Sequence, residues 1–229
     1  AHLCPRSDDE QAVRGWQLDV QPPPDEAVDA EAAVASSWVA RQSSIDSWGN
    51  QRTVFSHSRH HDVLQVTSRF EVERRLTARA PVPSPAWEAV AETLRYRVGG
   101  SPLEATEFSL PSWYAPCTAA LADFARQAFI PDVPLRDGAM ALMRQVHAHL
   151  SYQPGSTQVG TRAPDALAQR EGVCQDFANV MIAACRSLGL AARYVSGYLL
   201  TAPPPGQAPL IGADASHAWV QVWCPAQGW

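Results

Sequence analysis

Cys174 and His217 are the two residues whose types and spacing best suit chemistry on an amide bond. A thiol attacks a carbonyl carbon as a thiolate, and an imidazole can take the thiol proton and later return a proton to the leaving amine. A cysteine and a histidine that are distant in sequence and meet only in the fold are the arrangement expected of a catalytic thiol. We therefore predict Cys174 as the nucleophile and His217 as its base.

The segment around Cys174 predicts a helix with this residue at its start. The helix runs from Val173 to Leu188, Gly189 closes it, and its apolar stripe consists of Cys174, Phe177, Ala178, Met181, Cys185 and Leu188. Cys174 is therefore expected at the N-terminus of a buried helix. Unpaired backbone N–H groups at such a terminus favour a thiolate and can donate to the oxyanion of a tetrahedral intermediate.

Two predicted strands position His217. Residues 192–200 are rich in Tyr, Val and Leu, and residues 216–224 alternate between two faces, which indicates an antiparallel pair joined by a Pro- and Gly-rich loop. His217 stands at the entrance of the second strand. A short helix that opens at Pro164 precedes the helix of Cys174.

The local sequence favours a nucleophile over a packing role for Cys174. A buried cysteine on an amphipathic helix is commonly a core residue, because a free thiol packs as a small hydrophobe, and Cys185 at mid-helix keeps that interpretation. Around Cys174, however, four strings resemble in order the core of bacterial transglutaminase-like proteins: GVCQDFAN (172–179), RSLGL (186–190), ARYVSGY (192–198) and SHAWV (216–220).

This resemblance covers about residues 135–229, and the β-rich start resembles the N-terminal domain that accompanies the core in the same bacterial family. It implies a papain-like α+β core with a Cys-His-Asp triad, in which Cys174 and His217 supply the first two members. The family's acid follows a Gly-Trp like Gly228-Trp229, so the resemblance implies an aspartate after Trp229. The family often has histidine where Asn179 stands, which leaves specificity open.

Two aspartates within the chain are poorer candidates for the third member. Asp176 follows Cys174 by two residues on the same helix, so its side chain points about 200° away from the thiol. Asp214 precedes His217 in a loop and suits a solvated or turn-forming role.

The rest of the chain divides into two further parts. Residues 1–80 predict an all-β, sandwich-like domain, because Leu64, Val66, Phe70 and Val72 alternate with polar residues and Gly49-Asn50 marks a turn. Residues 81–134 form a proline-rich connector with helices expected over 86–97 and 119–129, and residues 135–229 form the α+β core, which begins with a helix over 135–150.

Composition excludes several classes of protein. The 229 residues are 46% hydrophobic and 18% charged with a net charge of −5, which is typical of a globular protein and unlike a nucleic-acid binder. No window approaches the roughly 18 apolar residues of a membrane span. The five cysteines have no disulfide or metal-site spacing, so we expect a cytoplasmic protein without metal or cofactor.

Other candidate residues have ordinary explanations beside functional ones. His57, His60 and His61 fall in a polar segment without further ligands at metal-binding spacing, and His147 and His149 are two apart on a helix and cannot face one target. Trp219 has two interpretations, as a shield of the site against water or as a core residue. Tyr152, just after the preceding helix, is a candidate donor to an oxyanion.

These observations predict thiol-dependent acyl transfer or hydrolysis at amide bonds of a protein or peptide, through a thioester on Cys174. Protease, deamidase and transglutaminase reactions all fit, because the acceptor is selected by water exclusion and pocket shape, and hydrolysis is slightly favoured. The alternative is a non-catalytic binding or scaffolding module on the same fold.

Overall fold

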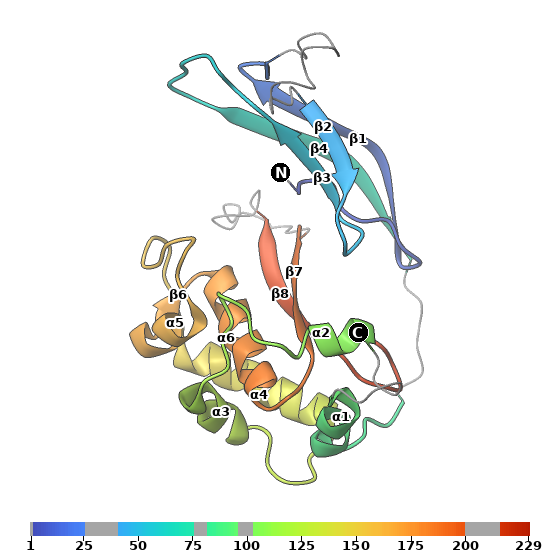
Figure 1. Ribbon diagram of the computed structural model, residues 1–229, viewed down its shortest axis with the longest axis vertical. Helices are drawn as coiled ribbons and strands as arrows, with labels where there is room; N and C mark the ends of the chain where they lie inside the picture. Colours follow the sequence, from blue (N-terminus) through green and yellow to red (C-terminus); the bar gives the residue numbers. More distant parts are fainter. Residues whose placement is uncertain (1, 26–40, 76–81, 96–102, 200–215) are drawn as a thin grey trace, which may run out of the picture. The chain divides into compact units, whose positions relative to one another are not determined.

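The computed structural model describes residues 2–25, 41–75, 82–95, 103–199 and 216–229. The chain divides into two compact units, Ala1–Ala80 and Pro81–Trp229 (Figure 1). The first unit is strand-rich and the second mixes helices with short strands, as predicted. No helix in the described ranges is long and apolar enough to cross a membrane.

The described part of the first unit consists of two antiparallel strand pairs. Strand β1 (Gln11–Gln21) pairs with β4 (Gln65–Arg74), and β2 (Arg41–Ile45) pairs with β3 (Gln51–Phe55). The predicted turn between β2 and β3 is present, and Gly49 takes the left-handed conformation there with φ of +81°.

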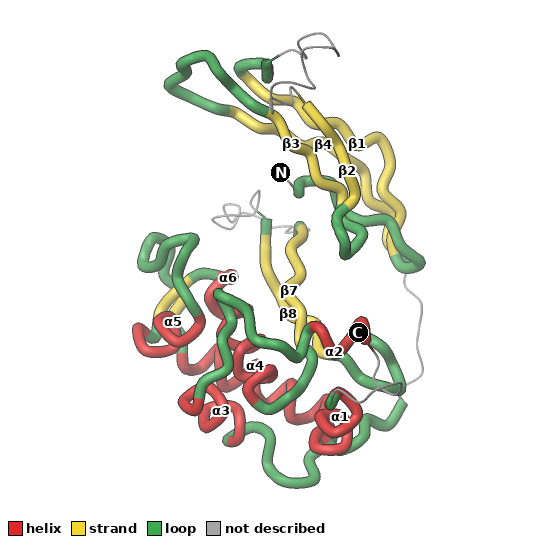
Figure 2. The backbone as a smooth tube through the Cα atoms, viewed as in Figure 1, coloured by secondary structure: helices red, strands yellow, loops and turns green. Residues whose placement is uncertain are grey.

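The second unit contains six helices and four short strands in its described part (Figure 2). The helices are α1 (Trp87–Leu94), α2 (Leu103–Glu107), α3 (Ala119–Arg126), α4 (Leu135–His149), α5 (Ala163–Gln169) and α6 (Cys174–Ser187). Strand β5 (Ser151–Tyr152) pairs in parallel with β6 (Glu171–Gly172), and β7 (Ala192–Gly197) pairs antiparallel with β8 (His217–Val222).

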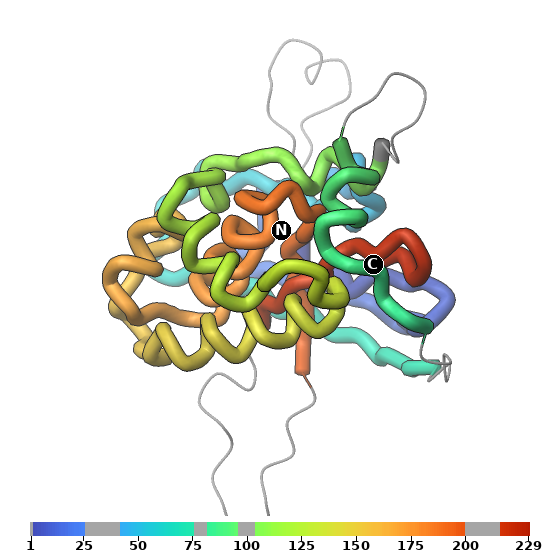
Figure 3. The backbone as a smooth tube through the Cα atoms, turned by 90° about the horizontal axis from the view of Figure 1, so that it is seen from below, coloured from blue at the N-terminus to red at the C-terminus, as the bar shows by residue number. Residues whose placement is uncertain are grey.

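Helix α6 is the centre of this unit. It packs against α3, α4, α5, β7 and β8, and Figure 3 shows it in orange among the other helices. Small buried residues, among them Ala178, Ala183 and Ala184, let neighbouring backbones come close on several sides. The position of the helix, and of its first residue, is therefore set by packing around most of its circumference.

Residues 81–134 differ from the expected connector. Val90 and Leu94 of α1, Leu121 of α3 and Phe129 are all buried in the same core cluster as α4 and α6. The prolines do keep the helices short, but each short helix has an apolar face that needs a partner. The segment is therefore an integral part of the second unit.

Packing of Phe129 against Gly138 gives a test of this arrangement. A Cβ atom added to Gly138 would collide with the Phe129 ring, whereas one added to the exposed Gly160 meets nothing within 4 Å. We expect Gly138→Ala to lower the free energy of unfolding by about 1–3 kcal/mol through overpacking. Gly160→Ala, the matched control, should stay within about 0.5 kcal/mol of the parent chain in urea denaturation. Equal stability of both variants would contradict the packing.

Candidate active site

Cys174 is the first residue of α6, as predicted. Val173 before it is extended, with φ of −111° and ψ of 179°. The backbone N–H groups of Asp176 and Phe177 both donate to the Val173 carbonyl, at 2.8 and 3.2 Å. The N–H groups of Cys174 and Gln175 donate to no other described residue. Two unpaired donors therefore lie beside the half-buried thiol.

Asp176 holds this helix start. Its carboxylate Oδ2 accepts from the Val173 N–H at 2.8 Å and from the Thr157 hydroxyl at 2.6 Å, and the residue is 1% exposed. The valine at the N-cap has no side-chain acceptor for the N–H groups of the first turn, and Asp176 instead accepts the N–H of the N-cap residue itself. The carboxylate makes no hydrogen bond to His217.

His217 is the first residue of β8 and pairs with Gly197 across the β7–β8 ladder. Its Nε2 atom is buried and has no hydrogen-bond partner within the described ranges. Cys174 and His217 are not hydrogen-bonded to each other. Catalytic hydrogen bonds are often long or poorly aligned before substrate binds. The predicted separation of about 3 to 5 Å stays a prediction. The expectation that Asp214 is a poor candidate for the acid also stays a prediction, because Asp214 lies outside the described residues.

A groove of about 810 Å³ opens beside Cys174, between α4, α6, β8 and the last residues of the chain. Apolar and aromatic side chains dominate it, among them Met140, Met143, Tyr152, Phe177, Met181 and Trp219. The predicted apolar stripe of α6 is therefore only partly core. Cys185 is fully buried, but Cys174, Phe177 and Met181 are half-buried along the groove.

The two aromatic candidates from the sequence both line this groove. Tyr152 is 58% exposed, and its ring centroid lies 6.5 Å from that of Phe177. Trp219 is 38% exposed, so it is not a core residue. His147 is exposed at the same groove, and the His149 ring instead bonds to the Leu167 carbonyl at 3.0 Å.

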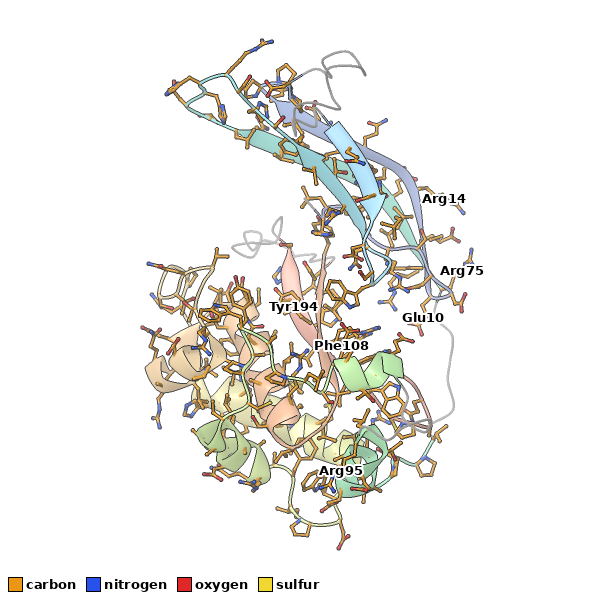
Figure 4. All side chains as sticks on the ribbon, in the orientation of Figure 1. Glu10, Arg14, Arg75, Arg95, Phe108 and Tyr194 are labelled. Atoms are coloured by element: carbon orange, nitrogen blue, oxygen red, sulfur yellow. The ribbon has the colours of Figure 1, made fainter. Side chains whose placement is uncertain are left out.

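Tyr194 is a candidate that sequence reasoning missed. Tyr194 lies on β7 and is labelled in Figure 4. It pairs with Val220, which lines the groove. Burial raises the pKa of its phenol, and negative charge on Cys174 and on Asp176 raises it further. Tyr194 thus stays a protonated hydrogen-bond donor within electrostatic range of the thiol. The sequence offered no signal for it, because an aromatic residue in a strand is ordinarily a packing residue.

His57 and His61 of the first unit pack on each other. The His57 ring centroid lies 5.7 Å from that of Phe55 and 5.1 Å from that of His61. In the part of the chain that the structure describes, no group of three His, Cys, Asp or Glu side chains is placed to hold a metal ion.

Comparison with known families agrees with this architecture. Residues 123–229 match the family described as the transglutaminase-like superfamily, and residues 1–73 match the bacterial transglutaminase-like N-terminal region. The chain belongs to the transglutaminase-like superfamily. The second match covers the strand-rich first unit, so this superfamily member also carries the accompanying bacterial N-terminal region.

Relatives of this transglutaminase-like chain occur in several bacteria. An uncharacterized protein of Mycobacterium tuberculosis is 40% identical over 193 residues, which are 82% of this chain and 59% of the relative. The chain thus spans about three fifths of that relative's length. A Pseudomonas aeruginosa protein named protein-glutamine gamma-glutamyltransferase is 32% identical over 156 residues, 62% of this chain and 23% of that protein.

A solved structure has the same fold. It is the crystal structure of "a Putative Cysteine Protease from Cytophaga hutchinsonii", with a TM-score of 0.63 and 19% sequence identity. The match covers 100% of this chain and 67% of that chain. At this identity the likeness establishes the shared fold and nothing about the reaction.

The cysteines should differ in reactivity according to their surroundings. Burial raises the pKa of Cys185 to about 12, whereas Cys174 borders the groove and Cys117 is exposed. We expect iodoacetamide at about pH 8 to modify Cys174 and Cys117 in the folded chain and to spare Cys185. Peptide mapping by mass spectrometry measures this, with the denatured chain as the control for complete labelling. Modification of Cys117 without Cys174 would contradict the site.

Tyr194 should make stability depend on alkaline pH. The raised pKa means that the folded chain favours the neutral phenol over the phenolate more strongly than the unfolded chain does. The contribution of Tyr194 to the free energy of unfolding is therefore fully present below the ordinary tyrosine pKa of about 10, and it is lost as pH rises through the raised pKa of the folded chain. We expect the parent chain to lose more stability than Tyr194→Phe between about pH 9 and about pH 11, measured by urea denaturation. Parallel losses in the two proteins would refute the shift.

Proposed function

We propose that this protein cleaves or transfers the acyl group of an amide through a thioester on Cys174. The observation that carries the proposal is the start of α6, where the thiol borders a groove and the N–H groups of Cys174 and Gln175 have no partner among the described residues. A nucleophile and an oxyanion site are thus supplied by the same helix end.

The reaction proceeds in two steps. The Cys174 thiol gives its proton to His217, the sulfur attacks the carbonyl carbon, and the carbonyl oxygen becomes an oxyanion that accepts from the unpaired N–H groups. The C–N bond then breaks as His217 returns the proton to the leaving amine. Water or a second amine afterwards attacks the thioester, the acyl group leaves the sulfur, and the thiol is regenerated.

His217 needs an acceptor that holds its ring. An imidazole base is fixed in tautomer and orientation when the nitrogen remote from the nucleophile donates to a third group. The buried and unpartnered Nε2 atom is suited to that bond. Asp176 is already engaged with Val173 and Thr157, so we propose that an aspartate after Trp229, as the resemblance implies, takes this role.

A protein or peptide is the proposed substrate. The name of the Pseudomonas relative refers to glutamine in proteins, and the groove beside Cys174 is large enough for side chains of a polypeptide. Hydrolysis is slightly favoured over transfer to an amine. The exposure of Tyr152 and Trp219 leaves the approach to the thiol open to water, and a transferase must exclude water from its thioester.

Substitution of the proposed pair tests the function. We expect Cys174→Ser to abolish turnover and His217→Asn to lower it by at least about a hundredfold, because the base is removed from both proton transfers. Ammonia release from a glutamine-containing peptide measures deamidation and transfer together, hydroxamate formation with hydroxylamine isolates transfer, and peptide mass isolates cleavage. Cys117→Ser, at an exposed cysteine, is the matched control and should keep the parent rate.

The same experiment addresses the binding-module alternative. The absence of a hydrogen bond between Cys174 and His217 is the one observation that favours a module without turnover. If the parent chain binds a glutamine-containing peptide in a calorimetric titration yet converts it in none of the three assays, and a C-terminally extended chain also converts none, the catalytic proposal is wrong. Turnover only in the extended chain would instead assign the missing acceptor to the extension.

A further inference from the structure

The backbone turn that precedes Cys174 is fixed by one buried carboxylate. Val173 occupies the N-cap of α6 without a side-chain acceptor, and Asp176 Oδ2 accepts its N–H at 2.8 Å. The same oxygen accepts the Thr157 hydroxyl at 2.6 Å. Asp176 is 1% exposed, so water does not compete for either bond.

The absence of a side chain at Gly172 leaves the space that Asp176 occupies. A Cβ atom added to Gly172 would lie 2.6 Å from both the Cβ and Oδ2 of Asp176, so only glycine allows the carboxylate to close over this position. The Gly172 carbonyl also accepts from the Gln153 N–H at 2.9 Å, next to the β5–β6 pairing. The turn 172–174 is thus held by its backbone and by Asp176 together.

A second bond ties the same loop to the helix start. The Gln175 side-chain amide donates to the Val159 carbonyl at 3.1 Å, two residues beyond Thr157. The loop 153–162 therefore contacts the first turn of α6 at two points, through Gln175 and through Asp176. Of the two, only Asp176 also bonds the residue that immediately precedes Cys174.

From these contacts we infer that Asp176 is a positioning residue for the nucleophile, acting through the Val173 N–H and Thr157, and not the acid of the His217 base. The inference rests on the proposed function. Asp176 makes no hydrogen bond to His217, and a residue two positions along a helix points about 200° away from the first. Its effect reaches the reaction through the backbone, by fixing where the thiol and the unpaired N–H groups of Cys174 and Gln175 lie.

The position of the Cys174 thiol and of the two N–H groups matters because the rate of acyl transfer is sensitive to small displacements. A shift of about 1 Å in a reacting group can lower a rate by about a hundredfold. The N–H groups also stabilise negative charge only while the helix end keeps its alignment. Loss of the Asp176 hydrogen bonds should therefore weaken both oxyanion binding and thiolate formation, although every reacting atom is still present.

Two substitutions at Asp176 separate position from charge. Asp176→Asn and Asp176→Ala both remove the negative charge, but only asparagine keeps a carbonyl oxygen that can accept from Val173 and Thr157. We expect the asparagine variant to keep turnover within about threefold of the parent, and the alanine variant to lose about a hundredfold. A residue that oriented His217 by its charge would give a different pattern, since its asparagine variant would also lose about four orders of magnitude.

A measurement that does not depend on turnover tests the role of Asp176 separately from the proposed function. The rate of Cys174 alkylation by iodoacetamide is measured at about pH 7 and at about pH 10.5, where thiols are largely ionised. We expect Asp176→Ala to react about tenfold more slowly than Asp176→Asn at the lower pH and at the same rate at the higher pH. If the parent chain alkylates but turns over no amide, the proposed function fails and the positioning inference is still tested.

Controls guard against a general effect on folding. Asp165→Ala removes an exposed carboxylate from the first turn of α5 and should leave both readouts unchanged. Thr157→Val removes one of the two bonds and serves if Asp176→Ala does not fold, with an expected loss of turnover of about tenfold. Equal behaviour of the alanine and asparagine variants in both readouts, or parent-like behaviour of Asp176→Ala or Thr157→Val, would overturn the inference.

Discussion

The start of helix α6 is the constraint on which the site depends. Its first residue is Cys174, and Asp176, in the first turn, accepts the backbone N–H of Val173 at the N-cap. Ordinarily a polar N-cap stands outside the helix and faces solvent. Here the capping group is buried, so the end of the helix is joined to the protein interior instead of to water. A thiol at such a helix end is held in place by the packed core.

The rest of the second unit surrounds this helix. Small residues on α6 admit α3, α4 and α5 on several sides, and β7 and β8 cover another. The strand that begins with His217 therefore packs on the helix that begins with Cys174, although about 43 residues separate them in sequence. The side of α6 along Phe177 and Met181 is left as a groove, so the thiol borders both packed core and open space.

Local signals in the sequence were enough for much of this fold. The apolar period and Gly189 predicted α6 to within a residue at each end, and Gly49 predicted the β2–β3 turn. Non-local relations were not predicted. The β5–β6 pair is two residues long and joins segments about 20 residues apart, and no short pattern encodes a pairing of that kind. The core role of residues 81–134 was not predicted for the same reason. Prolines indicate where a helix is interrupted, but they do not indicate what the helices between the prolines pack against.

The site shows the same division between local and non-local information. The helical periodicity of the sequence predicted Cys174 at a helix terminus. For Asp176, two residues further along the helix, it predicted only that the side chain points away from the thiol. The partner that gives Asp176 its role, Thr157, lies 19 residues earlier in a loop. Tyr194 likewise acquires its raised pKa from burial and from residues on another element. Chemistry that depends on such contacts becomes visible only once the chain is folded.

Burial of the second cysteine of α6 bears on how the protein would respond to oxidants. A thiolate-forming cysteine is the first to reach the sulfenic acid, and it escapes further oxidation when a nearby thiolate condenses with it to a disulfide. Cys185 lies eleven residues along the same helix, about 16 Å away by helical rise, and its pKa of about 12 keeps it a protonated thiol. Within α6, therefore, Cys185 cannot resolve a sulfenic acid on Cys174, and the thiol that does so must come from outside this helix.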